Sequence, residues 1–278
     1  MTAVLSSRGL GIHFGGHVAV NAVTADFHSG TLTAIVGPNG AGKTTYFNLL
    51  SGQLRASTGQ VLLEGRDVTR LGVAARTDLG IGRAFQLTNL FPLLTVLENV
   101  RLAVQSRAHA GFNMLARWRT RADLLERAHH YLALVGLGTR ASDMTASLPH
   151  GDKRKLEVAL LMALEPRILM FDEPTAGMSA GEVPVILELI QRLKAGGDRT
   201  ILLVEHKLDV IRSLADRIVV LHNGQMVADG PPAQVIASPV VQEAYLGVPA
   251  QTASSPDVAP PTPTLPSRGG LPPGGGAP

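Results

Sequence analysis

The residues in this sequence that are best suited to chemistry form a glycine-rich segment that ends in lysine and threonine. The segment, Gly37-Pro-Asn-Gly40-Ala-Gly42-Lys43-Thr44, has the spacing Gly-x-x-x-x-Gly-Lys-Ser/Thr of a phosphate-binding loop. Glycine lets backbone N–H groups converge on one anion, and a lysine ammonium neutralises phosphate charge. We therefore expect a nucleotide-binding loop rather than a plain glycine-rich turn. Its binding residues are Gly37, Pro38, Asn39, Gly40, Ala41, Gly42, Lys43, Thr44 and Thr45.

Two adjacent carboxylates form the second candidate group. Asp172 and Glu173 follow an apolar run at residues 168–171, which predicts a buried strand. Because successive side chains of a strand point in opposite directions, the two acids have different roles. We expect Asp172 to hold Mg²⁺ through its water shell, together with the hydroxyl of Thr44, and Glu173 to act as general base for the water that attacks the γ-phosphate. The alternative is a pair of acids that caps a helix.

Strands and helices alternate around these residues as a parallel sheet requires. A β-branched run at 31–36 precedes the glycine-rich loop, and residues 43–50 follow it with helical spacing. Further strand-like runs occur at 168–171, 201–204 and 218–221, with an amphipathic segment at 183–194 between the first two. The sequence therefore predicts an α/β fold with a mixed or largely parallel sheet.

Three other regions complete the predicted organisation. Near the N-terminus, residues 11–14 and 18–20 read as short strands, and an Asn-Gly pair at 223–224 predicts a hairpin that ends at about residue 228. Apolar spacings of three and four predict a helical subdomain over about residues 87–164. Residues 249–278 are rich in proline and glycine, which predicts a disordered tail.

Composition narrows the classes of function. The chain has 278 residues, of which 45% are hydrophobic, and its net charge of +3 is scattered, so we expect no nucleic-acid partner. Zero cysteines exclude disulfides and thiol catalysis. No apolar run reaches the roughly 20 residues that a membrane helix needs. If the protein serves a membrane, we expect it to do so from outside the bilayer.

The order of the motifs resembles the nucleotide-binding subunit of an ABC transporter, with a P-loop NTPase core over residues 5–248. Within this resemblance Gln86 corresponds to the glutamine that contacts Mg²⁺ or water, and His206 to the histidine that contacts the γ-phosphate. Phe14 falls where an aromatic residue stacks on adenine, although a core aromatic is the alternative. The resemblance implies ATP and Mg²⁺ as ligands, with Thr44, Gln86 and Asp172 at the metal. The implied catalytic residues are Glu173, His206, Gln86 and Lys43.

Residues 148–152 correspond to the signature loop of this family, which contacts ATP bound to the opposite subunit. The family sequence is Leu-Ser-Gly-Gly-Gln, whereas this chain has Leu148, Pro149, His150, Gly151 and Asp152. Pro149 lacks the serine hydroxyl that would contact the γ-phosphate. We therefore hypothesise that the site completed by this loop hydrolyses ATP weakly, which favours a heterodimer with a related subunit over a homodimer.

Several phrases resemble the ATP-binding subunits of branched-chain amino acid importers, and urea or amide importers share them. They are Arg83-Ala-Phe-Gln86, Glu173-Pro-Thr-Ala-Gly-Met178, Val204-Glu-His206 and Ala244-Tyr-Leu-Gly247. The resemblance implies a peripheral subunit on the cytoplasmic face of the inner membrane. Its partners are a second ATPase subunit, transmembrane permease subunits and, indirectly, an extracytoplasmic solute-binding protein. Apolar residues after Gln86 are expected to receive a helix of the permease: Leu87, Leu90, Phe91 and Leu93.

Two alternatives of other classes remain open from the sequence. One is a soluble ABC-type ATPase that acts on ribosomes or DNA, but such chains resemble fused pairs or carry coiled-coil insertions. The other is a module that binds ATP without hydrolysing it, and Pro149 is the feature that favours it.

Overall fold

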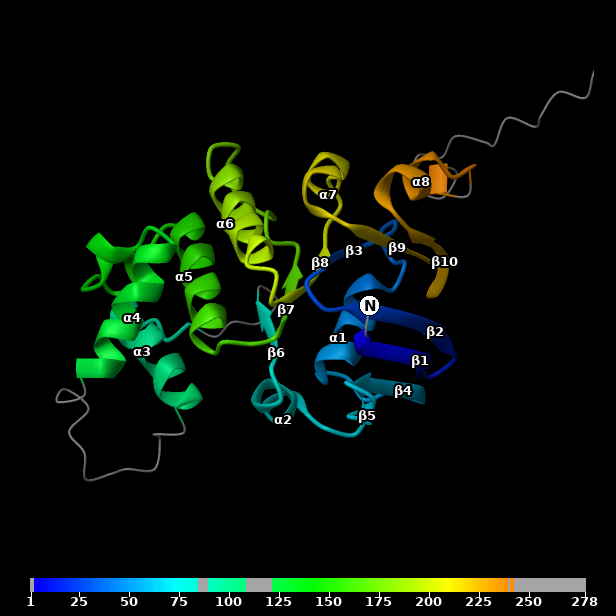
Figure 1. Cartoon of the computed structure of the whole chain (residues 1–278), viewed down its shortest axis with the longest axis horizontal. Helices are drawn as coiled ribbons and strands as arrows, with labels where there is room; N and C mark the ends of the chain where they lie inside the picture. The colour runs from blue at the N-terminus through cyan, green and yellow to red at the C-terminus, as the bar shows by residue number, and fades with distance from the viewer. Residues whose placement is uncertain (1–2, 85–89, 109–121, 240, 243–278) are drawn as a thin grey trace, which may run out of the picture.

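The structure is a computed structural model that describes residues 3–84, 90–108, 122–239 and 241–242 of the chain. The strands form two sheets, with the order β2-β1-β4-β5 in one and β10-β9-β3-β8-β7-β6 in the other. Helices α3, α4 and α5 lie together on one side of the molecule, and the smaller sheet lies on the other (Figure 1). This arrangement confirms the predicted α/β fold.

The six-stranded sheet is parallel except at the edge strand β10. Its parallel strands are β3 (Leu32–Val36), β6 (Ile81–Ala84), β7 (Ile168–Asp172), β8 (Thr200–Val204) and β9 (Arg217–His222). Every residue of β3, β7 and β8 is buried, as expected for central strands covered on both faces. Strand β10 (Gln225–Gly230) pairs with β9 in the antiparallel direction, as the Asn-Gly turn predicts. Because parallel strands end at the same edge, the segments that follow β3, β7 and β8 meet there.

The antiparallel sheet is larger than the sequence predicts. Strands β1 (Ala3–Phe14) and β2 (His17–His28) have 12 residues each, whereas the sequence predicts strands only at 11–14 and 18–20. Strands β4 (Thr58–Leu63) and β5 (Arg66–Asp67) complete the sheet. The polar Ser7 interrupts the apolar pattern of β1, although it is buried. Its Oγ lies 2.7 Å from the hydroxyl of Tyr46. A buried polar side chain that finds a partner is compatible with a core position.

Helix α1 (Lys43–Ser51) lies between the two sheets. A core cluster joins its Tyr46, Phe47 and Leu50 to apolar side chains of both sheets. Helix α2 (Val73–Asp78) supplies Arg76, whose Nη1 donates to the carbonyls of Leu49 at 2.7 Å and Leu50 at 2.6 Å. These bonds satisfy carbonyls that the end of a helix leaves free. The helix that follows the glycine-rich loop is therefore fixed along its length and at its C-terminus.

The predicted helical subdomain contains three helices among the described residues. They are α3 (Val96–Arg107), α4 (Ala122–Leu134) and α5 (His150–Ala163), and the short turns η2 (Gly138–Arg140) and η3 (Thr145–Ser147) precede α5. Thr95 and Glu98 form a capping box at the start of α3. Leu87 and the predicted tail at 249–278 lie outside the described residues. The domain boundaries stay predictions.

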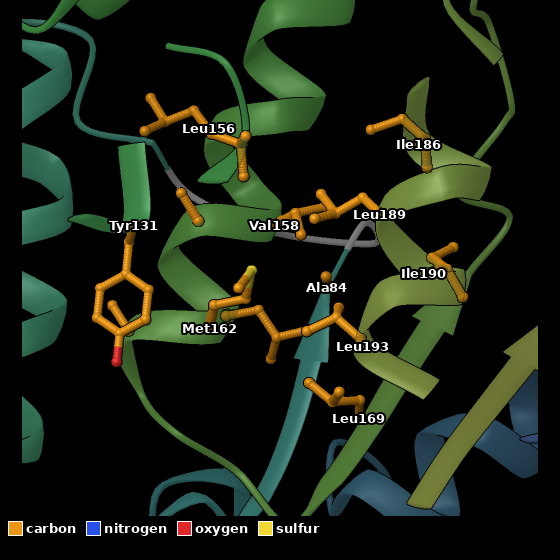
Figure 2. Close-up of a cluster of buried hydrophobic side chains, with 14 of the residues drawn as sticks. Ala84, Tyr131, Leu156, Val158, Met162, Leu169, Ile186, Leu189, Ile190 and Leu193 are labelled. Carbon is orange, nitrogen blue, oxygen red and sulfur yellow. The ribbon is translucent and has the colours of Figure 1, made fainter. Parts of the chain in front are cut away.

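Helix α6 (Val183–Ala195) joins the helical part to the larger sheet. Side chains of α5 and α6 meet above β6 and β7 in one core, in which Figure 2 labels Leu156, Val158, Met162, Ile186, Leu189, Ile190, Leu193, Ala84 and Leu169. Helices α7 (Leu208–Leu214) and α8 (Pro232–Ala237) pack against a separate cluster that involves β3 and β9. The shared core holds the start of α5 in place relative to the sheet.

No helix within the described ranges is both long enough and apolar enough to cross a membrane.

Candidate active site

The glycine-rich loop connects the end of β3 to the start of α1, as the sequence predicts. A Cβ on Gly37 would lie 2.1 Å from the carbonyl oxygen of Leu221, and one on Gly42 would lie 2.5 Å from that of Ala19. Gly40 has a φ of 78°, and no atom lies within 4 Å of the Cβ it lacks. Gly37 and Gly42 therefore permit close packing of the loop, and Gly40 permits a left-handed turn beside open space.

Lys43 is the first residue of α1 and is only 6% exposed. Its Nζ donates to the carbonyl oxygens of Gly37 at 2.8 Å and Pro38 at 2.9 Å, so the ammonium is held inside the loop. Burial lowers the pKa of Lys43, while the nearby charges of Glu173 and Asp172 oppose this effect. Helix α1 has no side-chain cap and no acidic residue in its first turn. Its positive end is therefore open to an anion.

An open pocket of about 410 Å³ lies over this loop. It is lined by Phe14, His17, Ala19, Glu173, His206 and residues 39–45. Phe14 ends β1 and is 51% exposed, so it is not the core aromatic that the sequence left open as an alternative. The pocket brings together the glycine-rich loop, the carboxylate of Glu173 and the imidazoles of His17 and His206, which come from separate parts of the chain.

Asp172 and Glu173 lie at the end of β7, where the backbone turns sharply. Asp172 is 5% exposed, and its Oδ2 accepts from Nη2 of Arg83 at 2.6 Å. Burial raises the pKa of Asp172, although the Arg83 guanidinium opposes this effect. Glu173 has a φ of 51°, which places its side chain on the pocket side rather than continuing the strand. The two neighbouring acids thus have different surroundings, as predicted, but the cause is the left-handed backbone at Glu173 rather than strand alternation.

Glu173 contacts His206 directly. The imidazole Nε2 of His206 lies 2.6 Å from Oε1 of Glu173, and both side chains are partly exposed in the pocket. The two residues follow β7 and β8, which are adjacent parallel strands. Gln86, the remaining residue predicted for this site, lies outside the described residues.

The predicted signature loop lies apart from the residues that line the pocket. Pro149 is the N-cap of α5 and gives it no side-chain cap, while Gly151 and Asp152 lie in the first turn. A Cβ on Gly151 would lie 1.8 Å from Oε1 of Glu182, so a larger residue there would displace this carboxylate. Burial raises the pKa of Asp152, but hydrogen bonds from Lys155 and Arg140 outweigh it and hold the pKa below its usual value. Leu148 is buried, whereas His150 is exposed.

Sequence reasoning missed three residues at or near the site. His17 lines the pocket beside Phe14, and no motif indicated it. Arg83 is part of the phrase Arg83-Ala-Phe-Gln86, but the sequence predicts no role for it at the site. Its Nη1 also donates to Asn48 Oδ1 at 2.5 Å, and its guanidinium lies 5.2 Å from the centre of the Phe47 ring. Glu205 is 3% exposed and lies directly beside His206. For Arg83 and Glu205, the available signal in the sequence was a charged residue at or next to the end of an apolar strand.

The donor set fits a triphosphate with Mg²⁺. The loop offers a buried ammonium and an open helix N-terminus, and the hydroxyl of Thr44 and the carboxylate of Asp172 are oxygen ligands of the kind that Mg²⁺ prefers. No group of three or more histidine or acidic side chains among the described residues could enclose a metal. This is expected when Mg²⁺ is bound by one or two protein groups, the phosphates and water.

Family models match two parts of the chain. Residues 20–176 match the model described as "ABC transporter", and residues 225–251 match the one described as "Branched-chain amino acid ATP-binding cassette transporter". The first match covers more than half of the chain and includes the glycine-rich loop and both acids.

Relatives and solved structures show the same similarity. The chain is 37% identical over 249 residues to the "High-affinity branched-chain amino acid transport ATP-binding protein LivG" of Escherichia coli, covering 88% of this chain and 98% of that protein. It is 37% identical over 251 residues to BraF of Pseudomonas aeruginosa, which carries the same description, with the same coverage. The structure of the ADP conformation of MJ1267, an ATP-binding cassette of an ABC transporter, matches with a TM-score of 0.76 at 28% identity, covering 89% of this chain and 100% of that one. This chain therefore belongs to the ATP-binding cassette family of ABC transporters.

Proposed function

We propose that this chain is a Mg²⁺-dependent ATPase subunit that energises import of branched-chain amino acids across a membrane. The observation that carries the proposal is the pocket in which Glu173 and His206 lie with the glycine-rich loop and its Lys43. The names of LivG and BraF support the solute, since each is described as a branched-chain amino acid transport protein. The match of residues 225–251 to a branched-chain amino acid transporter model supports it independently.

The residues of the pocket have distinct roles in this proposal. The backbone amides of residues 39–45 and the ammonium of Lys43 bind the β- and γ-phosphates, and Phe14 stacks on adenine. Thr44, Asp172 and Gln86 are the residues that would hold Mg²⁺, which when bound neutralises charge on the phosphate oxygens. Binding thus replaces the two contacts that Lys43 makes with loop carbonyls by stronger ones to phosphate.

The chemical step uses Glu173 and His206. Glu173 accepts a proton from the water that attacks the γ-phosphorus, and the bond from that phosphorus to the β–γ bridging oxygen breaks. His206 contacts the γ-phosphate and, through its 2.6 Å contact with Oε1 of Glu173, orients the base. The products are ADP and inorganic phosphate.

The proposed assembly contains two ATPase subunits and membrane subunits. The signature loop of one subunit completes the ATP site of the other, in accordance with its position apart from this chain's own pocket. ATP stabilises the closed pair, and loss of the γ-phosphate opens it. Phe91 and Leu93 are exposed, which favours them as the surface that receives a permease helix on the cytoplasmic face of the membrane.

The test is ATP hydrolysis by the full chain with and without Mg²⁺, followed by uptake of labelled leucine or valine in cells that lack this subunit. Magnesium-dependent hydrolysis and restored uptake support the proposal. Hydrolysis without restored leucine or valine uptake, but with restored urea or amide uptake, would replace the solute. Nucleotide binding without turnover in the assembled complex would instead support the module that binds ATP without hydrolysing it.

A further inference from the structure

Glu205 is a buried acid directly beside the proposed active site. It follows β8 and precedes His206, and it is 3% exposed. Successive residues of an extended chain point in opposite directions, so His206 faces the pocket while Glu205 faces the interior. Burying a carboxylate is costly unless its oxygens are hydrogen-bonded. The groups that bond to its two oxygens therefore indicate what this buried acid does.

Both oxygens of Glu205 accept a hydrogen bond. Oε1 accepts from the hydroxyl of Thr175, which is 2% exposed, and Oε2 accepts from the backbone N–H of His206 at 2.7 Å. Thr175 belongs to the loop that begins at Glu173, and the amide of Ala176 closes a turn on the Glu173 carbonyl at 3.1 Å. One side chain thus connects the loop that carries the base to the loop that carries the imidazole.

The hydrogen bonds of Glu205 add to a backbone hydrogen bond between the ends of β7 and β8. The amide of Glu173 donates to the carbonyl of Val204 at 2.9 Å, which fixes the backbones at a single point. Glu173 itself lies beyond the end of β7 and has a left-handed backbone. The two hydrogen bonds of Glu205, here called the Glu205 bridge, are a further contact beyond these strand ends, and Glu205 does not line the pocket. It constrains the same two loops whose side chains meet at 2.6 Å in the pocket.

We propose that Glu205 is a positioning residue for ATP hydrolysis, which acts by holding Thr175 and the backbone of His206 so that the imidazole of His206 contacts Glu173. The inference rests on the proposed roles of Glu173 and His206. Glu205 does not line the pocket, so its loss lowers the rate of hydrolysis and leaves ATP binding almost unchanged.

The first test compares two substitutions of Thr175 in the full chain. Thr175→Val removes the hydroxyl that donates to Glu205, whereas Thr175→Ser keeps it. Since a hydrogen bond to a charged group corresponds to roughly a 10- to 100-fold effect, we expect Thr175→Val to lower kcat by about that factor with KM for ATP changed less than about twofold. Thr175→Ser is expected to recover most of the loss.

Thr200→Val is the matched control. Thr200 is 2% exposed at the other end of β8, and its hydroxyl donates to the carbonyl of His28 at 3.2 Å. This substitution removes a buried threonine hydroxyl from the start of β8 without touching either loop. Equal losses of kcat in Thr200→Val and Thr175→Val would show that both act through general stability and would overturn the inference.

A double-mutant cycle tests the route of the effect. If Glu205 acts through His206, then Glu205→Gln lowers kcat in the wild-type background and has little further effect in a His206→Ala background. Equal fold-losses in both backgrounds would overturn the inference even though hydrolysis itself is intact.

Hydrogen exchange provides a test that does not need turnover. The amide of His206 donates to Glu205, so Glu205→Gln and Thr175→Val are expected to speed its exchange relative to Thr200→Val, measured on the full chain without nucleotide. An unchanged exchange rate of the His206 amide would contradict the inference that Glu205 holds the backbone of His206. If the wild-type chain shows no hydrolysis at all, the proposed function fails, and this measurement still decides whether the bridge exists.

Discussion

The imidazole Nε2 of His206 lies 2.6 Å from Oε1 of Glu173, although the two residues are 33 positions apart in the sequence. They meet because β7 and β8 are adjacent and parallel, with Asp172 paired to Val204 in the register. The contact brings the proposed general base and the proposed γ-phosphate sensor together in the pocket.

Glu173→Gln is predicted to retain ATP binding and to lose turnover. The amide keeps the size of the side chain but cannot accept a proton from water, so kcat should fall by roughly 10²- to 10⁴-fold. Phosphate release and fluorescent-nucleotide titration measure the two effects. Glu188→Gln is the control, since Glu188 pairs with Arg192 on the exposed face of α6. A mutant that hydrolyses ATP within a few-fold of wild type would remove Glu173 from this role.

Lys43→Ala is predicted to weaken ATP binding as well as hydrolysis. The substitution removes the one buried ammonium of the loop, and with it a charge-assisted contact to phosphate. A hydrogen bond to a charged group contributes about 1.5–3 kcal/mol, so Kd should rise by at least about tenfold. Isothermal titration checks this, with Arg192→Ala as a control for loss of an exposed positive charge. An unchanged Kd would mean that the nucleotide binds elsewhere.

Pro149→Ser is predicted to raise the ATPase rate of the assembled complex. Serine restores the hydroxyl that the family places at this position, and it also caps α5, which now has no side-chain cap. Helix capping alone must be separated from a catalytic effect. Pro231→Ser provides this control, because Pro231 is likewise the N-cap of a helix without a side-chain cap. No gain from Pro149→Ser, or an equal gain from Pro231→Ser, would contradict the hypothesis of a weak site.

Leu93→Cys is predicted to cross-link to a membrane subunit in intact membranes. Leu93 is 82% exposed, and the sequence has no cysteine, so any disulfide of this chain must involve the introduced thiol. Val73→Cys, on an exposed position of α2, is the control. Oxidative cross-linking and gel electrophoresis give the result. Cross-linking at Val73 but not at Leu93 would place the membrane subunits on another surface.

The local elements around the phosphate-binding loop were predictable because short segments carry their own pattern. The buried runs of β3, β7, β8 and β9 and the Asn-Gly hairpin follow the sequence closely. The full length of β1 and β2 was not predictable in this way. On β1, for example, Ser6 and Ser7 are polar residues at buried positions. Their hydroxyls bond to Asp26 and Tyr46, and such partners cannot be read from the strand itself.

The sequence by itself determined the chemistry of the loop at residues 37–45, because glycine conformation, the helix N-terminus and the adjacent lysine are local properties of consecutive residues. Only the tertiary structure decided that Glu173 meets His206 and that Glu205 joins Thr175 to the same place. Those contacts depend on which strands are neighbours and in what register, and the packing of the whole core sets both.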